Sequence, residues 1–176
     1  DYDKAKNLLM RSLKIYRKHL TENHNFIAWA SILLGKVYGQ QNNFQEAKNL
    51  LKNSLRIYEN NYGKDHIETA RILRNMGCVY LLEGNLETGE AYLRNALEIF
   101  KRNNHYESYV VLENLADLYL KKSGQEVNKK DSQQRKTCEN QARGCLKQAL
   151  EIVETYFPAN SPHIKRINNT IKSISN

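Results

Sequence analysis

Histidine and cysteine are the residue types that first suggest metal binding or acid–base chemistry in this chain of 176 residues. The candidates are three of the five histidines and the three cysteines: His24, His66, His163, Cys78, Cys138 and Cys145. Zinc sites use closely spaced ligands, and the chain has neither a Cys-x-x-Cys pair nor a Cys/His cluster. Cys138 and Cys145 are seven residues apart, which places them two turns apart on one side of a helix. We interpret the cysteines as reduced thiols of a cytoplasmic protein and predict no metal.

The sequence motifs that carry catalysis are missing as well. The chain contains no nucleophile–base arrangement, no glycine-rich phosphate loop, no His-Glu-x-x-His and no paired-carboxylate pocket. We therefore predict that this chain is not an enzyme and uses no cofactor. No apolar run approaches the roughly 18 residues that cross a bilayer, so we also predict no membrane span.

The positive charge is local. The net charge is +8, and half of it comes from the stretch 121–136, which holds six basic residues and two acidic ones. Such a stretch could bind nucleic acid or an anionic membrane, but no aromatic residues are interleaved for base stacking. We predict a flexible, solvated loop here. The alternative is that the next helix begins early, because the residues from Gln133 onward favour a helix.

The sequence repeats itself with a period of 42 residues, and this repeat determines how the rest of the chain is interpreted. The segment that starts at Asn23 lies over the segment that starts at Asp65. The matched pairs include His24 with His66, Gly35 with Gly77, Tyr38 with Tyr80, Leu51 with Leu93 and Ile57 with Ile99. Self-similarity at a fixed period indicates stacked helical or stranded units, none of which can bury its apolar face alone.

Each unit is predicted to consist of two helices, A and B, because apolar and small residues recur at helical spacing. In the first complete unit, helix A is marked by Ile27, Ala30, Ser31, Leu34, Val37 and Tyr38, and helix B by Phe44, Ala47, Leu50, Leu51, Ser54, Leu55 and Tyr58. The turns fall at 41–43 and 83–85. Capping-box patterns predict helix starts at Asp65 and Asn104, and Ser161 followed by Pro162 predicts another.

These patterns divide the chain into five parts. Residues 1–22 form helix B of a truncated first repeat, so we expect a fragment of a longer protein. The remaining parts are three repeats at 23–61, 62–103 and 104–157, the last with the basic insertion at about 121–136, and a capping helix at 158–176.

Small residues recur where helices A and B must cross closely. The set Leu34-Gly35, Tyr38, Ala47, Leu51 and Ser54 returns as Met76-Gly77, Tyr80, Gly89, Leu93 and Ala96, and again as Leu115-Ala116, Tyr119, Ala142, Leu146 and Ala149. This set resembles the tetratricopeptide repeat. The 42-residue period with the Tyr-Gly-Lys-Asp-His loop at 62–66 resembles the kinesin-light-chain type. The resemblance implies an all-α fold, a right-handed α–α superhelix (a tetratricopeptide solenoid) with a C-terminal capping helix.

The resemblance further implies a protein-interaction scaffold or adaptor that binds a peptide or partner protein in a concave groove lined by the A helices. The groove residues would be Trp29, Ile32, Leu33, Lys36, Arg71, Arg74, Asn75, Cys78, Glu113, Asn114 and Asp117. Asn75 and Asn114 hold the position that in this family often binds a peptide backbone. An apolar entrance followed by arginines favours a ligand with acidic and hydrophobic character, since guanidinium groups bind carboxylates through two donors.

Other interpretations stay open. Arg71 and Arg74 could pair with Glu113 and Asp117, and Trp29 and Ile32 could face a helix of a preceding unit. A chaperone-type carboxylate clamp is not clearly reproduced. Self-association through the truncated N-terminal repeat and RNA binding through the basic insertion are the alternative functions.

Two further expectations concern the histidines and the compartment. We interpret His24, His66 and His163 as helix-start residues, because positions a whole repeat apart cannot share a metal. The compartment is expected to be cytoplasmic, or a host cytoplasm if the parent protein is a bacterial effector.

Overall fold

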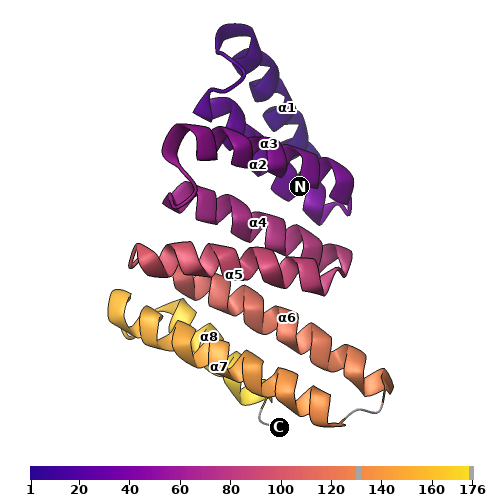
Figure 1. Ribbon diagram of the computed structural model, residues 1–176, viewed down its shortest axis with the longest axis vertical. Helices are drawn as coiled ribbons and strands as arrows, with labels where there is room; N and C mark the ends of the chain where they lie inside the picture. Colours follow the sequence, from indigo (N-terminus) through magenta and orange to yellow (C-terminus); the bar gives the residue numbers. More distant parts are fainter. Residues whose placement is uncertain (130–131, 175–176) are drawn as a thin grey trace. The chain divides into compact units, whose positions relative to one another are not determined.

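A computed structural model of the protein describes residues 1–129 and 132–174, and all their side chains except those of 126–129. Every regular element in this described part of the chain is an α-helix, and successive helices are joined by short connections (Figure 1). The all-α prediction is therefore confirmed. The chain divides into two compact units, Asp1–Ile99 and Phe100–Asn176, and each is described by itself below.

Four complete helices and most of a fifth build the first unit. They are α1 (Tyr2–His19), α2 (Asn25–Gln40), α3 (Phe44–Tyr62), α4 (Ile67–Glu83) and α5 (Leu86–Arg102). α2 pairs with α3 and α4 with α5, as two helical hairpins. Their turns contain Asn42 (φ 61°) and Gly84 (φ 89°), both left-handed, a conformation that asparagine and glycine adopt most readily. The equivalent turns predicted from the period are thus confirmed.

The two helices of a hairpin approach closely because their crossing points carry small residues. A Cβ atom added to Gly35 would lie 3.2 Å from Cγ of Leu51, and one added to Gly77 would lie 2.7 Å from Cγ of Leu93. The carbonyl oxygen of Gly89 is 3.1 Å from the same added Cβ. The repeating glycine is therefore a packing requirement rather than a turn signal.

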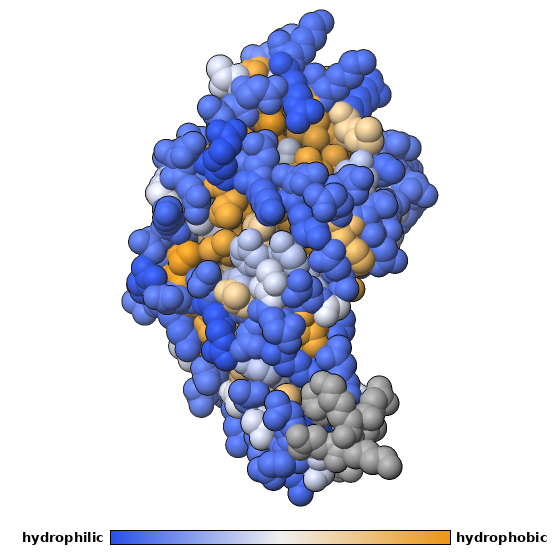
Figure 2. Space-filling view, turned by 45° about the vertical axis from the view of Figure 1, so that its right-hand side comes forward, coloured by the Kyte–Doolittle hydropathy of each residue, from blue (hydrophilic) through white to orange (hydrophobic). Residues whose placement is uncertain are grey.

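The core of the first unit lies between successive hairpins. Ala28, Leu51, Ile57, Ile72 and Met76 are completely buried and form one cluster there. Apolar side chains also reach the surface near the N-terminal helices, where Figure 2 shows hydrophobic patches between hydrophilic ones in its upper part. The exposed apolar residues of α1 are Tyr2, Leu8, Met10 and Ile15.

Histidines cap the helices, and this corrects part of the sequence prediction. Nδ1 of His66 accepts a hydrogen bond from the backbone N–H two residues later (3.2 Å), so His66 rather than Asp65 is the N-cap of α4. His105, and not Asn104, makes the same bond (3.2 Å) just before α6. A histidine nitrogen can therefore satisfy a free N–H at a helix start, as a Ser or Asp oxygen does. His24 caps α2 in the same way (3.1 Å).

The second unit contains the end of α5 and three further helices: α6 (Ser108–Lys129), α7 (Ser132–Tyr156) and α8 (Pro162–Ile174). The prediction of a flexible loop at 121–136 is wrong for the described residues. α6 continues to Lys129 and α7 begins at Ser132, so the insertion lengthens a helical hairpin. The early start of the last B helix, considered as the alternative, is confirmed. Lys130 and Asp131 lie outside the described residues.

α8 packs against α7 at the C-terminal end of the chain. Its N-cap is Ser161, whose Oγ accepts the N–H of His163 (3.3 Å), and Pro162 is its first residue, as predicted. His163 therefore lies inside α8 and is not equivalent to His24 and His66. The residue in that equivalent position is His105. Ile167 buries the inner face of α8.

Candidate functional site

A cavity of about 440 Å³ opens in the first unit between α2, the end of α3 and α4. Seven of the eight groove residues predicted for this unit line it: Trp29, Ile32, Leu33, Lys36, Arg71, Arg74 and Asn75. Tyr58, Tyr62, His66 and Glu68 complete the lining. The predicted Cys78 lies one turn beyond Asn75 on α4, outside this lining, and is half-buried. We call this cavity the A-helix pocket.

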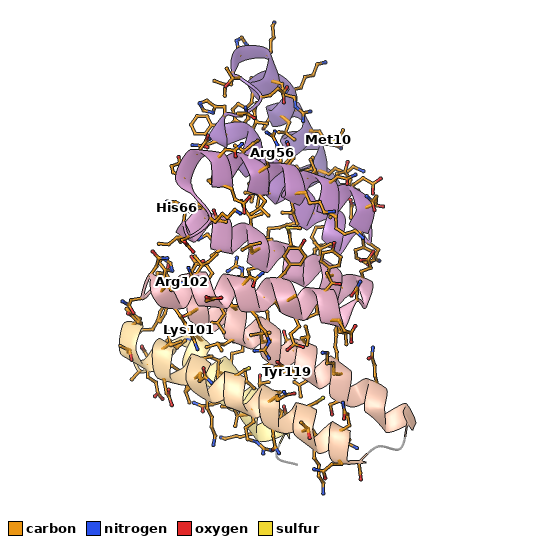
Figure 3. The ribbon with its side chains drawn as sticks, in the orientation of Figure 1. Met10, Arg56, His66, Lys101, Arg102 and Tyr119 are labelled. Carbon is orange, nitrogen blue, oxygen red and sulfur yellow. The ribbon has the colours of Figure 1, made fainter. Side chains whose placement is uncertain are left out.

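One wall of the A-helix pocket is a ladder of stacked rings. Tyr58 stacks on Tyr62 (5.7 Å between ring centroids, 28° between planes), and Tyr62 stacks on His66 (4.7 Å, 23°). The cap that His66 makes on α4 holds its ring in place, so the helix start also orients the end of the ladder. Figure 3 labels His66 at the start of α4. Trp29 on α2 is 52% exposed. Flat aromatic surface of this kind gives a ligand side chain a large contact area.

The charges on this pocket are mainly positive. Lys36, Arg71 and Arg74 contribute cations, and Glu68 is the one carboxylate in the described lining. Glu68 pairs with Arg71 one turn along α4. Burial raises the pKa of Tyr58, with Glu68 and Tyr62 adding to the increase and Arg71 opposing it, so this hydroxyl stays protonated and can donate a hydrogen bond.

The candidate residues of the second unit lie on α6, and Glu113 among them pairs with the capping helix. Arg166 of α8 donates two hydrogen bonds to the Glu113 carboxylate, from Nε (3.0 Å) and Nη2 (2.8 Å). Arg71 and Glu113 thus each have an ion-pair partner within their own unit. Partial desolvation raises the pKa of Asp117, which still reaches solvent; Glu113 adds to the rise, and Lys121 and Arg166 oppose it. The acidic character predicted for this helix is therefore partly neutralised.

Asn114 carries a polar atom without a partner. Its side-chain Oδ1 is buried and accepts no hydrogen bond. An unpaired buried carbonyl of this kind costs roughly 1–3 kcal/mol unless something donates to it. In the first unit, the equivalent Asn75 is 8% exposed at the edge of the A-helix pocket. Of the two asparagines predicted to bind a peptide backbone, Asn75 is therefore buried and Asn114 is partly buried.

Sequence reasoning missed four lining residues: Tyr58, Tyr62, His66 and Glu68. Tyr58 and Tyr62 come from the end of α3, His66 is the N-cap of α4 and Glu68 lies in the first turn of α4, whereas only positions further along the A helices had been considered. A signal was available for the two tyrosines, since Tyr58 and Tyr62 are four residues apart and therefore share one face of α3.

The described residues also bear on metal and membrane chemistry. Within them, no group of three or more His, Cys, Asp or Glu side chains could hold a metal ion. No helix of this part is long and apolar enough to cross a membrane.

Paired helices that repeat at a fixed period, with an open pocket beside their A helices, define a helical-repeat protein. A family model for the tetratricopeptide repeat matches residues 1–60 and 45–102, which together cover more than half of the chain. The chain belongs to the tetratricopeptide-repeat family. Repeats of this family generally serve as protein-interaction scaffolds.

Solved structures with similar folds are kinesin-light-chain-like repeat proteins, as the long period predicts. BtubC (BKLC) from P. vanneervenii aligns with a TM-score of 0.71 and 18% identity over 99% of this chain, which spans 65% of the length of BtubC. Two structures of a putative kinesin light chain from Podosopora anserina, with nearly identical TPR-like repeats, give TM-scores of 0.72 and 0.68 at 16% identity. They cover 98% of this chain, which spans 76% and 77% of theirs. A comparison with curated protein sequences gave no match.

Proposed function

We propose that this chain is a protein-interaction module that binds a peptide or an extended segment of a partner protein in the A-helix pocket. The observation that carries the proposal is the lining itself, which combines exposed aromatic surface with three cations. The ligand this lining fits best has an apolar or aromatic side chain and carboxylates close to it. Area buried against the ring ladder supplies affinity, and the cations select for acidic residues.

Each part of the pocket has a role in this proposal. The exposed ring of Trp29 and the nearly buried Ile32 beneath the pocket surface contact the ligand's apolar side chain. Lys36 and Arg74 bind its carboxylates, and the arginine can do so through two parallel hydrogen bonds. Asn75 is placed to hydrogen-bond the ligand backbone. The unpaired Oδ1 of Asn114 supports the same role for asparagine at this repeat position in the second unit.

Charge reversal at Arg74 tests the proposal. A panel of short fluorescent peptides would combine apolar residues with acidic, neutral or basic neighbours, and binding would be followed by fluorescence anisotropy. We expect the acidic-apolar peptides to bind the wild-type protein, and Arg74→Glu to weaken them at least about tenfold. The matched control is Arg56→Glu, the same charge change on α3 at a residue outside the pocket lining (Figure 3), which should leave binding unchanged.

Two results would contradict this function. One is a panel in which neither acidic nor apolar peptides bind the folded protein. The other is equal binding by the Arg74 and Arg56 variants, which would show that the pocket cations do not contact the ligand. Circular dichroism on both variants checks that each is folded.

A second candidate function is self-association through α1, which the exposure of this helix favours. Ile15 is 51% exposed, whereas the residues equivalent to it in the following repeats, Ile57 and Ile99, are 0% and 6% exposed. Oγ of Ser54 donates to the carbonyl of Ala28 on the paired helix (3.0 Å), whereas Oγ of Ser12 donates within its own helix. Sedimentation velocity would show a dimer that Ile15→Lys disperses. A monomer at all concentrations would exclude this candidate.

A further inference from the structure

Two equivalent positions of the internal repeat differ in the first unit: an aromatic ring of the chain stacks on Tyr80, whereas a cleft lies beside the equivalent Tyr38. Between the two hairpins, the Nζ of Lys48 on α3 lies 5.3 Å from the centre of the Tyr80 ring on α4. Tyr92 of α5 stacks on that ring, with 5.4 Å between centroids and only 8° between planes. Tyr92 is half-buried and packs against the core cluster of the first unit, and burial raises the pKa of its hydroxyl. The cation and the second ring thus both contact Tyr80.

One repeat earlier, the same arrangement lacks its second ring. Tyr38 is the residue equivalent to Tyr80. The Nζ of Lys6 lies 5.3 Å from the centre of the Tyr38 ring, the same distance as between Lys48 and the Tyr80 ring. The residue equivalent to Tyr92, 42 positions earlier, is Leu50. No aromatic side chain is therefore supplied by α3 to stack on Tyr38.

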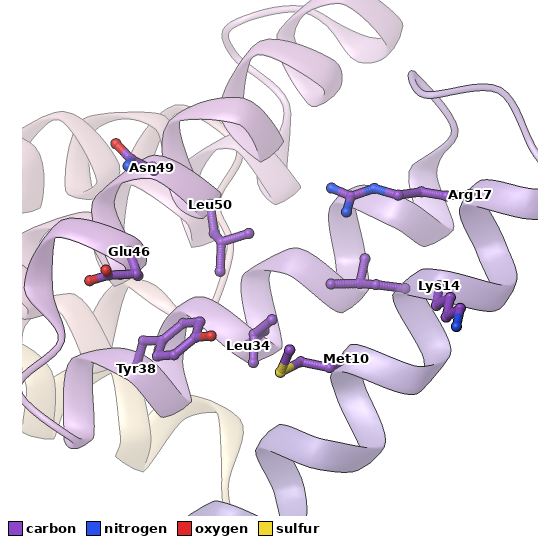
Figure 4. Close-up of a pocket in the computed structure, with 9 residues that line it drawn as sticks. Met10, Lys14, Arg17, Leu34, Tyr38, Glu46, Asn49 and Leu50 are labelled. Atoms are coloured by element: carbon purple, nitrogen blue, oxygen red, sulfur yellow. The ribbon is translucent and has the colours of Figure 1, made fainter.

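A cleft of about 520 Å³ opens at this place, between α1 and α3 and over α2. Its lining residues are Met10, Leu13, Lys14, Arg17, Leu34, Tyr38, Glu46, Asn49 and Leu50. Figure 4 shows Met10 and Arg17 of α1, Tyr38 of α2 and Leu50 of α3 around the same space. This volume lies in the range of sites that hold a small ligand or an anchoring side chain. We call it the α1–α3 cleft. It shares no lining residue with the A-helix pocket.

We propose that the α1–α3 cleft binds an aromatic side chain of a partner protein that carries an acidic residue next to it. The ring would stack on Tyr38 as the ring of Tyr92 stacks on Tyr80. The occupant is inferred from the chain's own repeat, which already places a tyrosine ring at the equivalent position. The proposal does not depend on peptide binding in the A-helix pocket.

The remaining lining residues fit such an occupant. Leu13 and Leu34 form a buried apolar floor, and the thioether of Met10, 48% exposed, can contact a ring edge. The net charge of the cleft rim is positive, because Lys14 and Arg17 of α1 line it and Glu46 is the one carboxylate of the lining. Arg17 also lies 3.7 Å from Glu22, but both side chains are largely exposed, so this pair is weak and leaves the guanidinium able to bind a second carboxylate. The charge complement of this rim is an acidic residue.

The methionine methyl groups provide a direct test. The chain has two methionines, Met10 in the cleft and Met76, which is completely buried in the core. With ¹³C-labelled methionine methyl groups, a ring that enters the cleft shifts the Met10 signal and leaves the Met76 signal in place. The probe is the capped tripeptide acetyl-Glu-Tyr-Glu-amide. Its controls replace tyrosine by cyclohexylalanine, or both glutamates by lysine.

We expect the Met10 methyl signal to move saturably with the acidic tyrosine peptide, because the ring current of the bound tyrosine changes the chemical shift of a neighbouring methyl group. The cyclohexyl and lysine peptides should bind at least about tenfold more weakly. Movement that is equal for all three peptides, or no movement of Met10, would overturn the proposal. Free p-cresol that binds as tightly as the tripeptide would overturn the assignment to a protein partner, since the neighbouring carboxylates would then contribute nothing.

A second experiment fills the cleft with a side chain of the protein itself. Leu50→Tyr should place a ring on Tyr38, raise the melting temperature by about 2–4 °C and abolish the peptide-induced shift of Met10. The matched variant, Tyr92→Leu, removes the existing ring from Tyr80 and should lower the melting temperature by a similar amount, while the Met10 shift persists. A Leu50→Tyr protein that is folded and still shows the full Met10 shift would contradict the proposed location.

Discussion

Replacement of Gly77 by alanine is the perturbation that tests the helical hairpin most sharply. The added Cβ would lie 2.7 Å from Cγ and 2.8 Å from Cδ2 of Leu93, and 3.1 Å from the carbonyl oxygen of Gly89. These distances are well inside van der Waals contact, so either Leu93 leaves its position or α4 and α5 move apart. Overpacking of this kind costs about 1–3 kcal/mol.

An opposing effect reduces the net change. Alanine is a better helix former than glycine by roughly 0.5–1 kcal/mol. We therefore expect Gly77→Ala to lower the free energy of unfolding by about 1–2 kcal/mol, which for a chain of this length corresponds to a melting temperature about 2–8 °C lower. Gly35→Ala should cost less, because its closest contact, with Cγ of Leu51, would be 3.2 Å.

Gly144 provides the control for this substitution. It lies inside α7, and a Cβ added there meets nothing within 4 Å. The same Gly→Ala change should therefore stabilise the protein by roughly 0.5–1 kcal/mol. Urea unfolding followed by far-UV circular dichroism measures both variants. If Gly77→Ala proved as stable as Gly144→Ala, close approach of the paired helices would not be what the repeating glycine provides.

The remaining predictions concern a buried hydroxyl and a perturbed carboxyl group. Ser54→Ala should lower the free energy of unfolding by about 1 kcal/mol, because Oγ of Ser54 donates to the carbonyl of Ala28 on the paired helix (3.0 Å). The control Ser12→Ala removes a hydrogen bond within one exposed helix, so it should change that free energy by less than about 0.5 kcal/mol. Chemical denaturation measures both variants. Desolvation and Glu113 raise the pKa of Asp117 in the folded protein, although the residue still reaches solvent, so its ionisation disfavours folding slightly at neutral pH, and this cost disappears as the pH falls below the ordinary value of 3.8. Asp117→Asn should therefore melt at a higher temperature than the wild type at pH 7, and the difference should shrink toward zero near pH 3.8. An unchanged difference across that range would show that the carboxyl group is not the cause.

The sequence was sufficient for the parts of the fold that depend on periodic packing. The recurrence of Gly35 and Gly77, and of Tyr38 and Tyr80, fixed the helical hairpins and their turns, because close helix crossings accept few residue types. It also identified most of the A-helix pocket, since the residues of a helix that do not pack inward must face outward.

Other features depend on chemistry that residue patterns represent poorly. The capping boxes before α4 and α6 were assigned to Asp65 and Asn104, one residue before the histidines that accept the N–H groups, because aspartate and asparagine are the commoner caps. The insertion was expected to be a loop because its charge suggested a solvated segment, yet the helices α6 and α7 simply extend into it. The Arg166–Glu113 pair could not be foreseen, since it joins residues 53 positions apart through the packing of the last helix.

The emission of Trp29 tests the central claim most directly. This is the chain's single tryptophan, it is 52% exposed, and it lines the A-helix pocket, so a bound ligand must change its surroundings. We predict a saturable blue shift of its fluorescence when an acidic-apolar peptide is added, and loss of that shift in Arg74→Glu but not in Arg56→Glu. Binding of such a peptide, detected by calorimetry, with no change in tryptophan emission would contradict the account and place the interaction surface elsewhere.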